Sequence, residues 1–373
     1  MLELMPHQKR IIEANPDNAI LNHEMRTGKT LIASIWIDHQ KRGNNTYIIC
    51  LKKNKKSWVA MNTKATVLTK EEFKKTTIIN PTAIVIDEAH YFASPLFVKG
   101  RSQLAEKMYR LLQDYPECHV LALSATPVRQ DPWSLHTLLC FIGVYKDWKQ
   151  WRDYFFELKK MPYLRFPAYF PRKDWRVKIR PFIEKYTDIV ALADVVEDLP
   201  PAETYIIDTP CTPYKEPEDE VVTWTHEHQH EQEKKGEWIA DLGYKKIIVV
   251  CYYTEQIDTI KKQLEEIKPV FVLDGRTKDQ ETIIKQAQEA EECYFIVQSS
   301  CGEGWDGWMF GAMVFASMAH SVFQHTQMLG RQRHPKHLKV TETYYLIGGR
   351  WDKRIYDTIK KGETFNAHKY LYE

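Results

Sequence analysis

Residues 22–30, NHEMRTGKT, decide how this chain folds. The tripeptide GKT at 28–30 is the phosphate-binding part of a P-loop: its glycine lets backbone N–H groups approach a polyphosphate, its lysine reaches the phosphate oxygens, and its hydroxyl ligates Mg²⁺. An apolar, helix-forming run, LIASIWI, follows at once, which would set the positive end of a helix dipole under the phosphates. The motif departs from the usual pattern at two positions, because His23 stands where a small residue is usual and Arg26 where glycine is common.

A second motif lies downstream at residues 83–90, AIVIDEAH. The apolar run predicts a buried parallel strand that delivers Asp87 and Glu88 at its carboxyl end, where open α/β sheets bind their ligands. In a nucleotide hydrolase, Asp87 would hold Mg²⁺ through water and Glu88 would orient or deprotonate the attacking water. An Asp-Glu pair can also merely end a strand and cap a helix, but the P-loop upstream favours the catalytic interpretation.

Composition sets the class of protein. The chain has 373 residues, enough for two or more domains, and its 43% hydrophobic content is ordinary for a globular protein. It has no apolar run near about 18 residues and no N-terminal signal pattern, so we expect a cytosolic protein with no membrane partner. Its seven cysteines include no CxxC pair and are expected to be reduced core residues. The net charge of +2 leaves any nucleic-acid affinity to local patches.

Residues 1–145 are predicted to form the first α/β domain. An amphipathic helix carrying Gln8 precedes the P-loop, and the last predicted strand ends in the sequence SATP. Three buried strands are predicted after the P-loop, at 47–51, 83–86 and 119–124. Because short apolar strands alternate with helices, this domain is expected to be a doubly wound parallel sheet.

Residues 146–236 are predicted to be an insertion and linker. The part at 146–180 holds eleven Lys and Arg against four Asp and Glu, with ten aromatic residues interleaved, which makes it the best nucleic-acid contact in the chain. Alternatively, the aromatic residues form a small core and the charges its solvated face, and both interpretations can hold together. The predicted nucleic-acid contacts are Lys159, Lys160, Arg165, Arg172, Lys173, Trp175 and Arg176.

Residues 194–237 are acidic, with thirteen Asp and Glu against three lysines, and are expected to be a connector and solvated loop. His226, His228 and His230 alternate within it. Three histidines can bind a metal, but the surrounding Glu and Gln and the lack of a cysteine partner favour a surface loop.

Residues 237–373 are predicted to form a second α/β domain. Five short strands are expected, at 245–252, 269–275, 293–300, 312–317 and 341–348. Between them lie a glycine-bearing turn, SCGEGWD, and the segment QHTQMLGRQRH, in which Gln327 and Arg331 stand out.

In this order the motifs resemble those of superfamily two helicases and translocases, specifically the Swi/Snf-like branch with a DEAH-type Walker B motif. PHQ resembles the adenine-reading Q motif, HEMRTGKT the P-loop, VIDEAH the Walker B motif and LSATP the coupling motif. YTEQIDTIKKQL, SSCGEGWDG and QMLGRQRH are similar to three motifs of the second lobe. KIRPFIEKYTDIVALADVVEDLPP resembles the Swi/Snf-like linker, and RWDKRIYDTI the short helix after the second lobe. The similarity covers nearly the whole chain.

The resemblance implies a fold and a role for each motif residue. The implied fold is α/β, with two RecA-like doubly wound parallel-sheet lobes and the basic, aromatic-rich segment inserted between them. The residues implied in ATP binding are Gln8, Arg26, Thr27, Gly28, Lys29, Thr30, Gly304 and Asp306. Those implied in catalysis are Lys29, Asp87, Glu88, Gln327, Arg331 and Arg333. Mg²⁺ would be held by Thr30 and Asp87. Ser124 and Thr126 would couple the state of the bound nucleotide to the nucleic acid along which the protein moves, its track.

One arginine position departs from the family pattern. Arg331 would reach the γ-phosphate and stabilise transition-state charge as an arginine finger. The family's second arginine falls at His334, one position after Arg333. Either a local change of helix register brings Arg333 into the finger role, or Arg331 works alone.

The function implied is that of an ATP-dependent DNA helicase or double-stranded DNA translocase. ATP hydrolysis at the lobe interface would drive movement along duplex, forked or branched DNA, without regard to sequence. The compact length favours a monomeric viral or bacterial motor, acting in the cytoplasm of a bacterium or of a virus-infected host cell beside replication or recombination proteins.

Two alternatives remain open. An RNA-directed ATPase of the same superfamily would have the same ATP-hydrolysing site but would move along RNA in place of DNA. A non-catalytic nucleic-acid-binding module would keep the fold and show no ATP turnover, although Lys29, Asp87, Glu88 and Arg331 argue against it.

Overall fold

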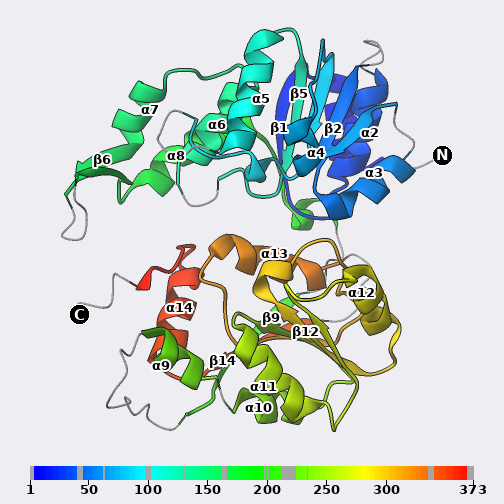
Figure 1. Cartoon of the computed structure of the whole chain (residues 1–373), viewed down its shortest axis with the longest axis vertical. Coiled ribbons are helices and arrows are strands. Elements are labelled where there is room, and N and C mark those ends of the chain that lie inside the picture. The colour runs from blue at the N-terminus through cyan, green and yellow to red at the C-terminus, as the bar shows by residue number, and fades with distance from the viewer. Residues whose placement is uncertain are drawn as a thin grey trace. The chain divides into compact units, whose positions relative to one another are not determined.

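Two compact units make up the protein, Met1–Glu197 and Asp198–Glu373, and each is built on its own six-stranded sheet (Figure 1). Every strand pairing in these two sheets is parallel. The computed structural model describes residues 4–39, 45–61, 64–96, 102–128, 131–160, 166–196, 199, 201–211, 224–232, 234–334 and 340–367.

The first sheet has the strand order β3-β2-β4-β5-β1-β8. Its strands are β1 (Asn18–His23), β2 (Thr46–Cys50), β3 (Thr66–Thr69), β4 (Ala83–Ile86), β5 (His119–Ser124) and β8 (Asp188–Val190). The helices of this unit are α1 (Pro6–Ala14), α2 (Lys29–His39), α3 (Lys55–Ala60), α4 (Lys70–Lys75), α5 (Gln103–Asp114), α6 (Trp133–Phe141), α7 (Trp148–Phe155) and α8 (Trp175–Tyr186). A separate antiparallel hairpin consists of β6 (Phe156–Lys159) and β7 (Ala168–Pro171).

Strand β4 shows why the first sheet is covered on both faces. Its side chains alternate, so that Ile84 and Ile86 enter one hydrophobic cluster while Ala83 and Val85 enter another. Helices α4 to α8 supply the first cluster, and α1, α2 and α3 the second. A strand buried on both faces has to be apolar along its whole length, which is the pattern read from AIVI.

The second sheet has the strand order β11-β12-β10-β13-β14-β9. Its strands are β9 (Ala202–Asp208), β10 (Lys246–Cys251), β11 (Val270–Leu273), β12 (Cys293–Gln298), β13 (Ala312–Phe315) and β14 (Thr341–Ile347). The helices are α9 (Trp224–His230), α10 (Lys235–Asp241), α11 (Thr254–Leu264), α12 (Gln280–Glu289), α13 (Val322–Gln332) and α14 (Arg350–Lys360). Helices α12, α13 and α14 pack on one face, and α10 and α11 on the other.

The predicted fold class, two doubly wound parallel sheets, is confirmed. The chain divides near residue 197, whereas the sequence led us to expect segments 1–145, 146–236 and 237–373. The expected insertion and linker are shared between the units, because β8 pairs with β1 at the edge of the first sheet and β9 pairs with β14 at the edge of the second.

Two composition-based expectations bear on the core. The seven cysteines are free thiols; all are buried except Cys211 and Cys301, which are partly exposed. Within the described ranges, no helix combines the length and the apolar composition that crossing a membrane requires.

Candidate nucleotide-binding and catalytic site

Three neighbouring strands of the first sheet, β4, β5 and β1, end at the same edge. The P-loop follows β1, Asp87 and Glu88 follow β4, and β5 ends at Ser124. Because parallel strands share a carboxyl edge, this strand order gathers motifs that lie about a hundred residues apart in the sequence.

The P-loop is curled around the ammonium group of Lys29. Its Nζ donates to the carbonyl oxygens of His23 at 2.6 Å and Glu24 at 2.8 Å. Two loop residues have left-handed backbone conformations, Arg26 with φ 66° and Gly28 with φ 83°. Helix α2 then begins at Lys29, so the N–H groups of its first turn face the loop. The loop therefore offers backbone donors and one cation to an anion.

Gln8 lies against the P-loop and is buried, with 4% of its surface exposed. Its Nε2 donates to the carbonyl oxygen of Thr27 at 3.1 Å, and His7 Nε2 donates to the same oxygen at 2.8 Å. A Cβ added to Gly28 would lie 2.2 Å from Gln8 Nε2. Side chains of α1 thus hold the backbone of the loop. Position 28 requires glycine for two reasons, its positive φ and the close approach of Gln8.

Gly28→Ala is expected to lower the free energy of unfolding by about 1–3 kcal/mol, because alanine is strained at φ 83° and its Cβ displaces the Gln8 amide. Urea denaturation measures the change. In a Gln8→Ala background the collision is gone and only the backbone strain remains, so Gly28→Ala should cost less there. Equal costs in both backgrounds would show that the Gln8 contact does not constrain the loop.

His23, the departure at the front of the P-loop, is explained by β8. Its side chain is fully buried, and its Nε2 donates to Asp188 Oδ1 at 2.7 Å. The Asp188 carboxylate also accepts from Arg10 of α1, at 3.0 Å from Nη2. Burial lowers the pKa of His23, so a neutral imidazole donates to the carboxylate. The larger side chain therefore ties the P-loop to the edge strand β8, which the sequence did not predict.

Asp188 should make the stability of the first unit sensitive to acid. Burial alone would raise the pKa of Asp188, but hydrogen bonds from His23 and Arg10 outweigh it and lower the pKa from 3.8 to about 2. Because the folded-state pKa lies below the unfolded one, this stabilisation is complete above about pH 4 and is lost as the pH falls toward 2. Asp188→Asn is expected to cost about 2 kcal/mol at pH 7 and to flatten the stability profile between about pH 4 and pH 2. Urea denaturation across this pH range tests it, and an unchanged profile would contradict it.

Asp87 is held in place by two side-chain donors. Its Oδ2 accepts from Asn54 Nδ2 at 3.0 Å and from Trp58 Nε1 at 2.9 Å, and its backbone N–H donates to the carbonyl oxygen of Ile49. Asn54 and Trp58 lie in the lysine-rich segment after β2 and were not predicted. A carboxylate oriented in this way and a P-loop hydroxyl, that of Thr30, are donors of the kind that Mg²⁺ accepts.

Glu88 has a left-handed backbone, with φ 50° and ψ 53°. Such conformations are rare outside glycine and cluster at functional sites. Its Oε2 lies 3.3 Å from His90 Nδ1, and the same nitrogen lies 3.1 Å from Ser124 Oγ. Ser124 Oγ in turn accepts from the backbone N–H of Thr126 at 3.1 Å. A chain of contacts thus joins the carboxylate after β4 to both predicted coupling residues, Ser124 at the end of β5 and Thr126 after it.

The second unit places its motif residues around one turn. Arg331, near the end of α13, donates through Nε to the carbonyl oxygen of Gly302 at 2.7 Å and through Nη1 to that of Trp305 at 3.1 Å. Gly304 has φ 80°, which allows the turn. The backbone carbonyl of Asp306 accepts from a side-chain amide of α12. Arg331 therefore holds the glycine-bearing turn against α13.

The other two predicted residues of this helix differ in burial and contacts. Gln327 is buried, with 6% of its surface exposed. Arg333 forms the C-cap of α13, and its Nε is buried without a hydrogen-bond partner among the described residues. His334 lies against the ring of Trp308. Two nitrogens of Arg331 thus donate to its own turn, while the Nε of Arg333 has no hydrogen-bond partner among the described residues.

Trp175 does not lie where the sequence placed it. It is 6% exposed and belongs to the core of the first unit together with Trp151 and Phe155. The guanidinium of Arg176 covers its ring at 4.7 Å. Trp175 therefore offers no open face to nucleic acid. For the described part of 146–180, the small-core interpretation holds for several aromatic residues.

The basic residues predicted to contact nucleic acid have different environments. Lys160 and Lys173 are exposed. Lys159 forms an ion pair with Glu157 at 2.7 Å, and Arg172 Nη2 donates to the backbone of Asp153. Arg165 lies outside the described residues.

Comparisons with known proteins give the fold. No family model and no curated protein matches the chain. The chain is similar to the Sulfolobus solfataricus SWI2/SNF2 ATPase core in complex with dsDNA, with 14% identity and a TM-score of 0.43 over 96% of this chain and 91% of that one. It is also similar to a variant of S. cerevisiae Dbp5 bound to a Gle1 variant and IP6, with 13% identity and a TM-score of 0.54 over 97% of this chain and 87% of that one. This second likeness shows the fold. The expectation of two RecA-like lobes is confirmed.

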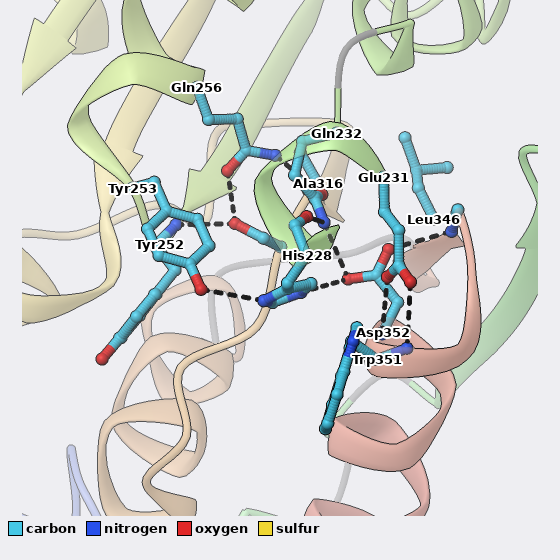
Figure 2. A network of polar contacts seen from close by, with 12 residues as sticks. His228, Glu231, Gln232, Tyr252, Tyr253, Gln256, Ala316, Leu346, Trp351 and Asp352 are labelled. Atoms are coloured by element: carbon cyan, nitrogen blue, oxygen red, sulfur yellow. Dashed lines mark hydrogen bonds and ion pairs between the residues drawn. The ribbon is translucent and has the colours of Figure 1, made fainter. Parts of the chain in front are cut away.

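The second unit also contains a buried polar network that sequence reasoning missed (Figure 2). Figure 2 shows the His228 ring between the Tyr253 hydroxyl and the Asp352 carboxylate, each 2.9 Å from a ring nitrogen. The ammonium of Lys235 is 1% exposed and lies within 2.7 Å of four oxygens, which belong to Gln232, Ala316, Leu346 and Asp352. The network joins α9, α10 and α14 to the carboxyl ends of β13 and β14.

Three residues of this network carry side chains of the kind that bind metal ions. Among the described residues, His228, Glu231 and Asp352 form one group whose ligand atoms lie within 4.8 Å of one another. Glu231 accepts from the backbone N–H groups of Trp351 and Asp352, at 3.1 and 3.0 Å. Both nitrogens of His228 are engaged, and the Lys235 ammonium already lies 2.5 Å from Asp352 Oδ2. The lysine supplies the positive charge, so the group is structural.

The expectation that three alternating histidines lie on a surface loop was wrong. They lie on α9, where His226 is exposed, His230 partly exposed and His228 fully buried. Residues two apart on a helix point to opposite sides, whereas residues four apart share a face. His228 therefore enters the core while the other two stay at the surface.

Proposed function

We propose that this protein is an ATP-dependent motor that hydrolyses ATP to move along or remodel DNA. The observation that carries the proposal is the shared edge of β4, β5 and β1, which brings the P-loop, the Asp87-Glu88 pair and the Ser124-Thr126 segment together. These are the parts that phosphoryl transfer needs: a phosphate cradle, a metal-binding carboxylate and a group that orients water.

The P-loop would bind the triphosphate of ATP. Lys29 donates to two carbonyl oxygens of its own loop. Phosphate oxygens carry more negative charge than these carbonyls, so the ammonium would exchange the loop oxygens for them. Gln8, which now holds Thr27, would keep the loop shape and read the adenine.

Thr30 and Asp87 would hold Mg²⁺, which neutralises charge on the phosphates when bound. The two donors on Asp87 fix the orientation of its carboxylate. Glu88 would orient or deprotonate the attacking water. Its Oε2 lies 3.3 Å from His90 Nδ1, a contact that would help to orient the carboxylate.

Coupling to the track would run through His90. Because one imidazole nitrogen contacts both Glu88 and Ser124, a change at the carboxylate alters the hydrogen bond that orients the segment up to Thr126. From the second unit, Gly304 and Asp306 would contribute to ATP binding, and Gln327, Arg331 and Arg333 to catalysis.

The proposed track is duplex or branched DNA, contacted through phosphates and independent of sequence. The sequence likeness of the linker and of the helix RWDKRIYDTI to Swi/Snf-like ATPases favours this track over RNA. We further propose a viral or bacterial setting beside replication or recombination proteins.

ATP hydrolysis by the purified chain tests the proposal, measured alone and with duplex DNA, forked DNA, single-stranded DNA or RNA. We expect duplex or forked DNA to stimulate turnover, and Glu88→Gln to reduce it by about 10²-fold or more. If RNA stimulates turnover most strongly, the proposal that the motor moves along DNA is wrong. If turnover is absent, or is equal in the wild type and Glu88→Gln, the proposal of an ATP-driven motor is wrong.

A further inference from the structure

The β6–β7 hairpin presents apolar side chains to solvent outside the core. At its base, Phe156 is 3% exposed and stacks on Trp133, with ring centroids 4.9 Å apart. Two residues further along β6, Leu158 pairs directly with Tyr169 across the hairpin. These two side chains are 58% and 46% exposed. Strand residues two apart share a face, so the apolar face of the hairpin continues past the edge of the core.

Helices α7 and α8 also expose apolar side chains. On α7, Tyr154 is 47% exposed, and on α8, Val177 is 68% exposed. Figure 1 shows α7, α8 and β6 extending to one side of the first sheet. A folded protein gains no stability from apolar side chains left in water, and such patches commonly mark binding surfaces.

Positive charges lie directly against the exposed rings. The guanidinium of Arg152 lies 4.8 Å from the centroid of the Tyr169 ring, and Lys178 Nζ lies 5.4 Å from that of Tyr154. The segment 146–180 carries eleven basic residues and four acidic ones. A partner that matches both features has flat apolar groups on an anionic backbone, which describes unpaired nucleotides.

We infer that the β6–β7 hairpin, with α7, is a stacking platform for the unpaired bases of single-stranded nucleic acid, and that Leu158 and Tyr169 form its contact surface. The inference takes from the proposed function only that the ligand is a nucleic acid. Bases in a duplex are stacked on one another and offer no free face. The platform therefore selects the separated strand, which a forked or branched substrate presents and an intact duplex does not.

Binding of fluorescein-labelled oligothymidylate, oligouridylate and a duplex of equal length tests this, by anisotropy and without nucleotide. Tyr169→Ala is expected to weaken binding of the single strands about tenfold, because the stacking of a base on one ring contributes roughly that much. Leu158→Ala with Tyr169→Ala should weaken it further. Tyr169→Phe keeps the ring and should restore binding. Ile79→Ala, at a side chain 61% exposed elsewhere on the first unit, is the matched control and should change nothing.

Weakening for DNA alone, RNA alone or both supports the platform and identifies its strand. Single-strand binding that is the same in the wild type and the double variant overturns it. A change of oligomeric state in the double variant, measured by sedimentation with binding unchanged, also overturns it and makes the face a protein contact. Failure of the proposed function appears as absent ATP turnover and does not affect this comparison.

Discussion

Arg333→Ala is expected to lower the ATP turnover number by about 10³-fold, the typical contribution of an arginine finger. The reason lies in the two arginines at the end of α13. Nε and Nη1 of Arg331 donate to carbonyl oxygens of its own turn, whereas Arg333 has a buried Nε without a partner among the described residues. The free energy of unfolding should change by about 1 kcal/mol or less, because the buried Nε has no acceptor to lose among the described residues. Steady-state ATPase assays and urea denaturation measure the two effects.

Arg331→Ala is the matched control and should behave differently. It leaves the carbonyl oxygens of Gly302 and Trp305 without their donor, so we expect a loss of about 1–3 kcal/mol in stability as well as reduced turnover. A variant at Arg333 that turns over ATP like the wild type, beside a folded but inactive Arg331→Ala, would assign the finger to Arg331.

Lys235→Met is expected to lower the free energy of unfolding by about 3–5 kcal/mol, more than is expected of Gly28→Ala or Asp188→Asn. The ammonium and the carboxylate of Asp352 are each 1% exposed and 2.5 Å apart. Burial alone would raise the pKa of Asp352, but the charge of Lys235 and the hydrogen bond from His228 lower it to about 2. Removing the lysine leaves a buried carboxylate without its cation, at a large desolvation cost. Urea denaturation provides the measurement.

Lys234→Met tests the specificity of that loss. Lys234 is the exposed neighbour of Lys235, and its replacement should change stability by about 0.5 kcal/mol or less. In the double variant Lys235→Met with Asp352→Asn, both charges are gone, so its cost should be smaller than the sum of the two single costs. Additive costs, or a Lys235→Met variant as stable as the wild type, would show that the pair is not coupled.

Most of the central strands could be predicted from apolar runs in the sequence. The run AIVI at 83–86 forms β4 as expected, because an unbroken apolar run of this length predicts a strand that is buried on both faces. The same logic gave β5 and the strands at the centre of the second sheet. These strands also end in the motif residues, so the positions of Asp87, Glu88 and Ser124 in the fold could be predicted with them.

Strands β8 and β9, each at one edge of its sheet, could not be predicted in this way. Strand β9 is exposed along most of its length and has an apolar run of only three residues, and β8 has only three residues in all. Both are stabilised by pairing on one side with strands far away in the sequence, β14 and β1. The sequence around Asp188 therefore gave no sign that its carboxylate would bind His23.

Contacts between distant residues explain the other errors. His228 and Asp352 lie 124 residues apart, and composition alone placed the histidine in a solvated loop. Trp175 was assigned to nucleic acid because aromatic and basic residues alternate around it, a pattern that does not distinguish a ring in the core from an open one. The exposed pair Leu158 and Tyr169 became visible only through the register of the hairpin.

Triplex displacement tests the central claim, ATP-driven movement along DNA, most directly. A labelled third strand is placed at increasing distances from the end of a duplex, and its release is followed after ATP is added. The motor proposed here predicts a lag that grows with distance for the wild type and no release by Glu88→Gln. Hydrolysis that is stimulated by the duplex but releases no third strand at any distance would contradict movement along DNA.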